Sequence, residues 1–229
     1  EVRAELRYAP GEELVYTKQH SRPINRDAPI FTLSHSFGIS GVLGGQYRYN
    51  MTEATFFKRI WAKSWGKIDV DVRAGAQWNQ VPFPLLIMPA ANLSYLVQYG
   101  TFELINNMEF LNDRYASLNV SWDLNGKLFN RLPLIKHLKW REYVAVRMLW
   151  GDLTDKNNPL LAQNAGSPVL MQFPEGSFVM NPSRPYVEVS VGVHNVFRFF
   201  HIEYVRRLNY LDLPTASKHG VRVKLSLKF

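Results

Sequence analysis

The stretch that decides the fold is the last one of the chain, GVRVKLSLKF at residues 220–229. Apolar and polar side chains alternate strictly through it, and an aromatic residue closes it. Its apolar positions are Val221, Val223, Leu225, Leu227 and Phe229. Because successive side chains of a β-strand point to opposite sides, this alternation predicts a strand with one apolar and one polar face. A two-faced strand with an aromatic end is typical of an outer-membrane β-barrel.

The same alternation recurs along the whole chain. Residues 184–194, for example, alternate four valines with other, mostly polar, residues. The pattern predicts β-strands at 2–8, 12–19, 30–38, 45–62, 65–79, 94–110, 113–124, 139–152, 184–194, 197–210 and 220–229. Several are longer than the usual strand of about 5 to 6 residues, as strands that cross a bilayer at a tilt have to be. The sequence therefore predicts an all-β protein, and within that class a transmembrane antiparallel β-barrel.

The composition of the 229 residues leaves two classes of fold. No run of about 18 residues is uninterruptedly apolar, so the sequence predicts no transmembrane helix. The 14% of aromatic residues suits the aromatic girdles of a membrane barrel, but would also suit a β-sandwich. Lys or Arg on the lipid side costs about 2–4 kcal/mol at the bilayer midplane, so in a barrel Arg222, Lys224 and Lys228 must face the lumen. A soluble β-sandwich would bury the apolar face instead, and the pattern alone does not separate the two.

Several functions are excluded or disfavoured. The chain has no Cys, which excludes disulfides and zinc sites built on thiolates. The formal charge is +8, but Lys and Arg are spread singly along the strands, so we expect no nucleic-acid partner. The oxygen-rich set Asp152, Asp155, Asn157 and Asn158 matches no EF-hand spacing, and we interpret it as a turn rather than a metal site. Without a G-x-S-x-G or H-E-x-x-H motif, we expect no enzyme and no cofactor.

In a barrel, the connections between strands lie alternately on the two sides of the membrane. With the C-terminus placed in the periplasm, the connections expected outside are 20–29, 153–183 and 211–219. Those expected in the periplasm include 80–93 and 125–138. Eleven strands are an odd number, whereas single-chain bacterial barrels have an even number. We therefore expect the C-terminal part of a larger barrel, unless the weakest strand, 12–19, is not a strand.

One of these connections carries basic candidate residues for a partner contact. In 125–141, leucines interleave with basic residues at the spacing of one or two amphipathic helical turns. The candidates are Lys136, Lys139 and Arg141. This surface would dock a partner protein or inner-leaflet lipid, unless the segment is a structural plug under the barrel mouth.

A second connection, 153–183, is long and unusually apolar for a loop. Its candidate contact residues are Leu170, Met171 and Phe173. Apolar loops of this kind either meet another protein or fold inward, so the alternative to a partner contact is a lid over the lumen.

Two runs carry a resemblance to a known family, NMEFLNDRYASL at 107–118 and FNRLPLIKHLKWRE at 129–142. Together with the aromatic-tailed last strand, they resemble the C-terminal barrel region of a Bacteroidota outer-membrane family of unknown function. Full-length members of that family carry an N-terminal carboxypeptidase-regulatory-like domain. The resemblance implies that this domain and the first strands are not in the chain. It also implies that the last strand is the signal taken up by the outer-membrane assembly machinery, and that it closes the barrel against the first strand.

The sequence thus predicts a single outer-membrane β-barrel domain over residues 1–229, located in the bacterial outer membrane. We expect a polar, mildly basic lumen and a structural, transport or assembly-accessory role. Its expected partners are outer-membrane lipid or lipopolysaccharide, the assembly machinery during biogenesis, and a stable membrane-protein complex. The alternatives are a subunit of an outer-membrane protein assembly or export complex, a soluble β-sandwich binding module, and a barrel-embedded hydrolase for which the sequence nominates no catalytic residue.

Overall fold

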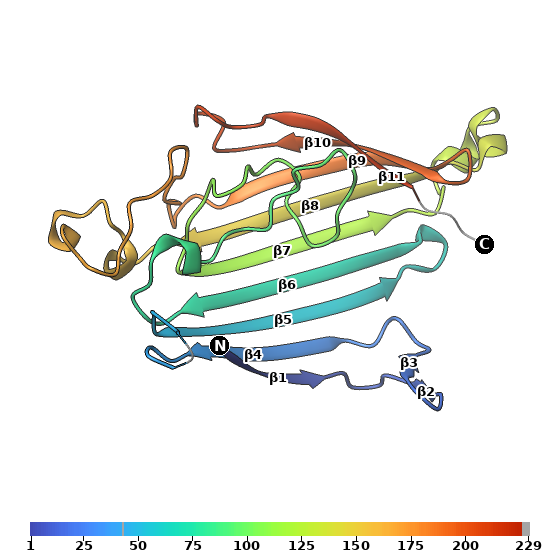
Figure 1. Cartoon of the computed structure of the whole chain (residues 1–229). Helices are drawn as coiled ribbons and strands as arrows, with labels where there is room; N and C mark the ends of the chain where they lie inside the picture. Colours follow the sequence, from blue (N-terminus) through green and yellow to red (C-terminus); the bar gives the residue numbers. More distant parts are fainter. Residues whose placement is uncertain (43, 226–229) are drawn as a thin grey trace.

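A computed structural model describes residues 1–42 and 44–225, and it confirms an all-β protein (Figure 1). In this part of the chain, nine strands form one antiparallel sheet whose order follows the sequence. They are β1 (Val2–Tyr8), β4 (Ile30–Gly38), β5 (Tyr49–Trp61), β6 (Lys67–Gln77), β7 (Arg114–Asp123), β8 (Arg141–Asp152), β9 (Tyr186–Val196), β10 (Phe200–Arg207) and β11 (His219–Leu225). Leu227 and Phe229 of the predicted last strand lie outside the described residues.

The other elements are small. A separate hairpin pairs β2 (Leu14–Tyr16) with β3 (Ser21–Pro23), so the predicted strand 12–19 is reduced to three residues and does not join the sheet. Single 3₁₀ turns occur at Lys63–Trp65, Phe83–Leu85, Phe129–Arg131, Ile135–Leu138, Asp155–Asn157 and Ala162–Asn164. Among the described residues, no helix is long and apolar enough to cross a membrane.

The two faces of the sheet are covered in an unusual way. On β9 the polar positions are buried, with Glu188 at 0% exposure, whereas Val191 on the opposite face is 57% exposed. The same holds on β10, where Arg207 is fully buried and Tyr204 is exposed. The protein core therefore lies on the polar face of the sheet, and the apolar face points away from it.

The polar face is covered by the β6–β7 connection, residues 78–113, which we call the inward segment (Figure 1). The predicted strand 94–110 lies in this segment and is wrong, because the segment makes only isolated bridges there and β6 pairs directly with β7. The chain turns at Gly100 (φ 74°) and at Met108 (φ 57°), which interrupts an extended course. Apolar residues of the segment then form two core clusters against the sheet and the neighbouring loops, around Phe110 and Leu111.

Without a strand at 94–110, the connections divide between the ends of the sheet differently from the prediction. The loop end carries 39–48, 78–113, 153–185 and 208–218. The turn end, on the right in Figure 1, carries 9–29, 62–66, 124–140 and 197–199. The prediction is therefore wrong in placing 80–93 on the same side as 125–138, and 20–29 on the same side as 153–183.

The sheet is open among the described residues, because β1 and β11 do not pair with each other. The outer edge of β11 instead binds the inward segment, where the Val223 N–H donates to the Tyr95 carbonyl at 2.8 Å. The Val97 N–H donates back to the Val223 carbonyl at 3.0 Å. No strand of the described part pairs with the outer edge of β1, which is exposed along its whole length.

Candidate functional site

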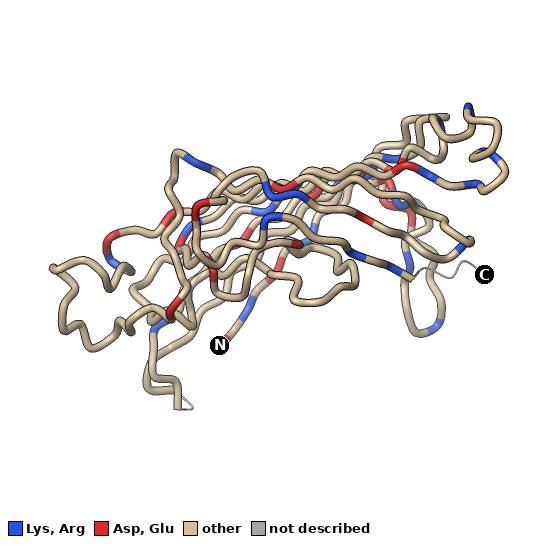
Figure 2. Tube along the Cα trace, turned by 90° about the horizontal axis from the view of Figure 1, so that it is seen from above, with Lys and Arg blue, Asp and Glu red and all other residues tan. Residues whose placement is uncertain are grey.

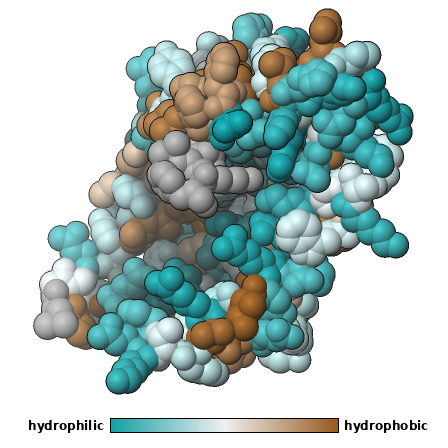
Figure 3. All heavy atoms as spheres, turned by 90° about the vertical axis from the view of Figure 1, so that its right-hand side faces the viewer, coloured by the Kyte–Doolittle hydropathy of each residue, from teal (hydrophilic) through white to brown (hydrophobic). Residues whose placement is uncertain are grey.

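A cavity of about 440 Å³ lies between the polar face of the sheet and the inward segment, near the turn end. Seen from that end, hydrophilic residues border a hollow in the molecule (Figure 3). The walls come from β5 to β11, and residues 97–100 of the inward segment form the remaining side. Its volume lies in the range of about 300–1,000 Å³ of small-molecule sites.

One wall is a row of ion pairs formed by side chains of β5 and β6. Arg59 on β5 lies directly opposite Asp69 on β6, and their side chains form a two-pronged contact, with Nε–Oδ1 at 2.6 Å and Nη2–Oδ2 at 2.8 Å. Lys67 adds a third contact to Asp69 at 3.4 Å. Further along β6, Arg73 binds Asp71 at 2.9 Å. Arg59 and Lys67 share Asp69, and Arg73 pairs with Asp71, so the wall has an excess of one positive charge and exerts only a weak net attraction on anions.

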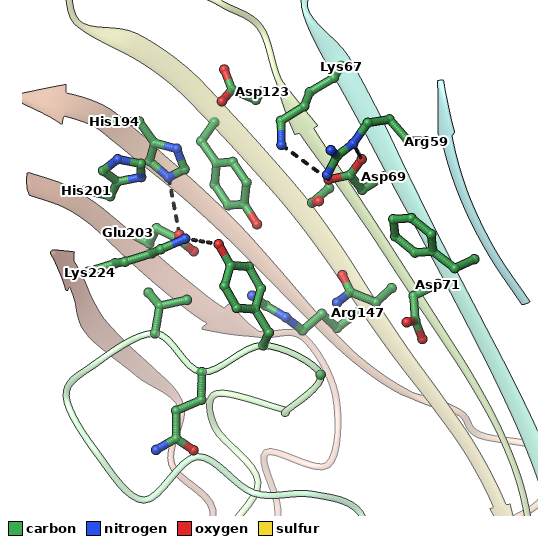
Figure 4. A pocket seen from close by; sticks show the side chains of 18 of the residues that line it. Arg59, Lys67, Asp69, Asp71, Asp123, Arg147, His194, His201, Glu203 and Lys224 are labelled. Atoms are coloured by element: carbon green, nitrogen blue, oxygen red, sulfur yellow. Dashed lines mark hydrogen bonds and ion pairs between the residues drawn. The ribbon is translucent and has the colours of Figure 1, made fainter. Parts of the chain in front are cut away.

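The opposite wall is aromatic and includes two histidines (Figure 4). The Tyr143 ring stacks on His194 with a centroid distance of 4.3 Å, and His194 in turn contacts the tilted ring of His201 at 4.1 Å. His194 Nε2 lies 3.3 Å from an Oε1 of Glu203, which comes from the next strand. These residues alternate along β8, β9 and β10, so the period of two places them all on the polar face of the sheet.

Buried ion pairs anchor the inward segment to this polar face. The Glu103 carboxylate lies 3.6 Å from Arg147 on β8 and 3.1 Å from Arg222 on β11. Glu188 on β9 accepts the backbone N–H groups of Glu103 and Leu104, at 2.9 and 3.1 Å. Burial, partly offset by these cations, raises the pKa of Glu103 above its ordinary value.

A second anchor lies nearer the loop end. Arg207 on β10 binds Glu109 of the inward segment at 2.7 Å, and both side chains are fully buried. The guanidinium also lies 4.9 Å from the ring centroid of Tyr186 and 5.8 Å from that of Phe110. Removing one member of such a buried pair would leave an uncompensated charge, so this pair fixes where the segment lies.

A comparison with known families identifies the chain. The family described as "Family of unknown function (DUF5686) C-terminal domain" matches residues 1–158, which include β1 to β8 and the whole inward segment. The chain belongs to this family. No curated protein and no solved structure matches it.

In this DUF5686 C-terminal domain, the basic candidates Lys136, Lys139 and Arg141 lie at the turn end. The predicted helical turns are confirmed as the two 3₁₀ turns of 124–140. Residues 131–139 are almost all exposed, so they are not packed as the structural plug that is the alternative to a partner contact. The carbonyl of Lys139 accepts a hydrogen bond from the Asn195 side chain at 2.7 Å, and Arg141 is the first residue of β8.

The apolar candidates lie at the other end of the domain. Phe173 packs against the cluster around Leu111, as expected for a loop that folds inward. Met171 is exposed. Leu170 is half-buried. The structure therefore does not bring the two sets of candidate contact residues together.

The oxygen-rich set at 152–158 is used within the chain. The side chain of Asn157 accepts the Val81 N–H at 2.9 Å and donates to Asp113 at 2.9 Å. Asn158 accepts the N–H of Leu160 at 3.0 Å, which is the predicted Asx turn. Among the described residues, no group of three or more His, Asp or Glu side chains could hold a metal ion.

The anchors of the inward segment were not predicted from the sequence. The sequence predicts a strand at 94–110, and it identifies neither Glu103 and Glu109 as anchors nor their arginine partners. One feature of the sequence does indicate an irregular segment. Residues 80–93 contain three prolines and an apolar run, which are incompatible with a strand, and Gly100 follows them. An interrupted segment that carries carboxylates, set among arginine-bearing strands, indicates a segment folded against them.

Proposed function

We propose that this chain is a transmembrane β-barrel domain of the bacterial outer membrane, with lipid on its apolar face and the inward segment in its lumen. The observation that carries the proposal is the inversion of the two faces. Glu188 and Arg207 are fully buried, whereas Val191, midway along an inner strand of the nine-stranded sheet of the described residues, is 57% exposed. A continuous apolar face of this size is unfavourable in water and favourable in hydrocarbon.

The tryptophans of the apolar face support this proposal by their positions. Trp65 and Trp122 stack at the turn end, with ring centroids 6.1 Å apart, and Trp78 and Trp150 lie at the loop end. Trp122 pairs with Ile68 on β6, and Trp78 follows Ile68 by ten residues. Ten residues span about 33 Å along a strand, or about 23 Å at a tilt of about 45°, close to the apolar band of about 25 Å of outer-membrane barrels.

Polar side chains on the apolar face occur near its two borders. Lys58 lies near the turn end and donates to the carbonyl of Asp27 at 2.7 Å. His35 and Thr52 bind each other at 2.9 Å near the loop end. Arg206, the one charged residue of β10 on this face in the described part, is also near the loop end. Such positions let polar groups reach the membrane surface while the middle of the face stays apolar.

The open sheet bears on the size of the barrel. Because β1 and β11 do not pair in the described part, closure requires other strands between them. We therefore propose that the nine strands are the C-terminal part of a larger barrel, with an even total number. The soluble β-sandwich is disfavoured, since it needs a second sheet over the apolar face and the described residues supply none.

The role of the domain follows from its filled lumen. The inward segment occupies the polar face, so passage of a solute would require its displacement, and a structural or assembly-accessory role needs no such movement. A subunit of an outer-membrane assembly or export complex is a second candidate, favoured by apolar side chains on the surface of the loop end. Leu160 is 66% exposed there, and Met171 is 45% exposed.

The proposal is tested by purification and gel migration. A membrane barrel needs detergent and migrates differently on a gel when heated, because its strands resist unfolding by detergent at room temperature. Full solubility and monodispersity without detergent would refute the proposal and favour a soluble fold.

A further inference from the structure

The connection 124–140 forms an exposed basic surface at the turn end, which we call the basic rim. Its cations are Lys127, Arg131, Lys136 and Lys139, and no Asp or Glu lies between Asp123 and Glu142. These four cations form no ion pair with any other described residue. The rim therefore carries a positive charge that nothing in the described chain neutralises.

The basic rim is also apolar. Leu134 is 84% exposed, and Leu128, Leu132 and Leu138 are exposed as well. Hydrogen bonds hold the segment in place, from the Leu124 N–H to the Glu142 carbonyl at 3.0 Å and from the Phe129 N–H to the Glu142 carboxylate. Leucines interleaved with cations on a fixed surface are typical of segments that lie in the membrane–water interface.

The position of the rim fits that interface. Lys127 donates to the Ser64 hydroxyl at 2.9 Å and lies 5.3 Å from the ring centroid of Trp65. Trp65 in turn stacks on Trp122 at the end of the apolar face. The rim thus begins at the tryptophan pair that borders the proposed lipid band and projects beyond the sheet, with its Lys and Arg residues spread along the projection (Figure 2).

We propose that the basic rim binds the headgroups of anionic phospholipids. This inference rests on the proposed function, since it needs the apolar face to be in lipid. The turn end carries the two tight connections 62–66 and 197–199, and short connections face the periplasm in outer-membrane barrels. The lipid is then that of the inner leaflet. Charge complementarity favours lipid phosphate, because the cations are spread along the surface and each gains from any nearby anionic headgroup.

The test compares two lipids of opposite headgroup character on the intact chain in mild detergent. Phosphatidylglycerol and phosphatidylcholine with the same acyl chains are titrated, and bound lipid is counted by native mass spectrometry. The wild type should prefer phosphatidylglycerol. The triple variant R131Q/K136Q/K139Q should lose this preference on the order of 100-fold, from about a factor of five for each cation near an anionic surface.

A matched control lies at the same end of the sheet. The 9–29 connection exposes Lys18, Arg22 and Arg26 but also contains Glu12, Glu13 and Asp27, so its charge is balanced. The triple variant K18Q/R22Q/R26Q has the same net charge as the rim variant and should keep the preference for phosphatidylglycerol. Equal loss in both variants would overturn the rim as the site, because the effect would then follow net charge alone.

Two further results would overturn the inference without touching the proposed function. In the first, the protein needs detergent and shows heat-modifiable migration but binds both lipids equally. In the second, an acidic protein co-purifies with the wild type but not with the rim variant, while lipid binding is the same in both. Failure of the proposed function itself looks different, since the protein would then be soluble without detergent and retain neither lipid.

Discussion

A single charged residue introduced into the middle of the apolar face would distinguish a membrane barrel from a soluble sheet. Val191 is the sixth of the eleven residues of β9, and its side chain is 57% exposed. If that exposure is to lipid, Val191→Lys places an ammonium group near the bilayer midplane and destabilises the fold by about 2–4 kcal/mol. This corresponds to about 30- to 900-fold in the folding equilibrium. If the exposure is to water, the same change stays within about 0.5 kcal/mol.

The assay is urea unfolding of the protein reconstituted in phosphatidylcholine vesicles, with the folded fraction measured by heat-modifiable gel migration. Val15→Lys is the matched control, because Val15 is 47% exposed and lies in the small β2–β3 hairpin outside the sheet. We expect Val191→Lys to lower the free energy of unfolding and Val15→Lys to leave it unchanged. Equal effects of the two substitutions would refute the assignment of the apolar face to lipid.

Three further predictions concern the lumen and one turn. Arg207→Leu should destabilise the fold by about 3–5 kcal/mol, because it leaves Glu109 buried and unpaired, and adding Glu109→Leu should restore most of that loss in urea unfolding. The pKa of Glu103 is raised in the folded state, so its contribution to stability is present at low pH and is lost as the pH rises through the raised pKa. Glu103→Gln should therefore reduce the pH dependence of the unfolding free energy in this range, measured by urea unfolding at a series of pH values. Gly66→Ala should cost more than about 1 kcal/mol in the same unfolding assay, because Gly66 has φ 82° and an added Cβ would overlap the Asp123 carbonyl oxygen; an unchanged midpoint would contradict the turn geometry.

The sequence predicts the strands well where alternation is strict and the next strand along the chain is the partner. On β9, the valine alternation identifies both the strand and its apolar face, because a period of two is a local property. The prediction of a strand at 94–110 is wrong for the same reason, because a local pattern does not include the partner strand. A ladder needs a free neighbouring edge, and β6 and β7 occupy each other from Lys67 to Ala76. Local pattern does not reveal which edges remain free.

For the cavity on the polar face, the sequence predicts that charged residues line it but not which of them pair. Its charges were expected on the polar face, because Arg or Lys in contact with lipid is costly. The individual pairs were not, since they depend on register. Arg59 meets Asp69 because the β5–β6 turn fixes the pairing of these two residues. Glu103 meets Arg222 across 119 residues of sequence, and only the folded inward segment sets that contact.

The balance of buried charge in the lumen determines what the inward segment can do. The sheet contributes Arg147, Arg207, Arg222 and Glu188 to the anchors, and the segment contributes Glu103 and Glu109. Together these are three cations and three carboxylates, so the anchored state is neutral. Withdrawal of the segment would leave three arginines and one carboxylate on the polar face of the sheet, and water or anions would have to compensate the excess positive charge. The polar face would then attract anions strongly, whereas the anchored, neutral state does not, so movement of the inward segment would change the charge preference of this face.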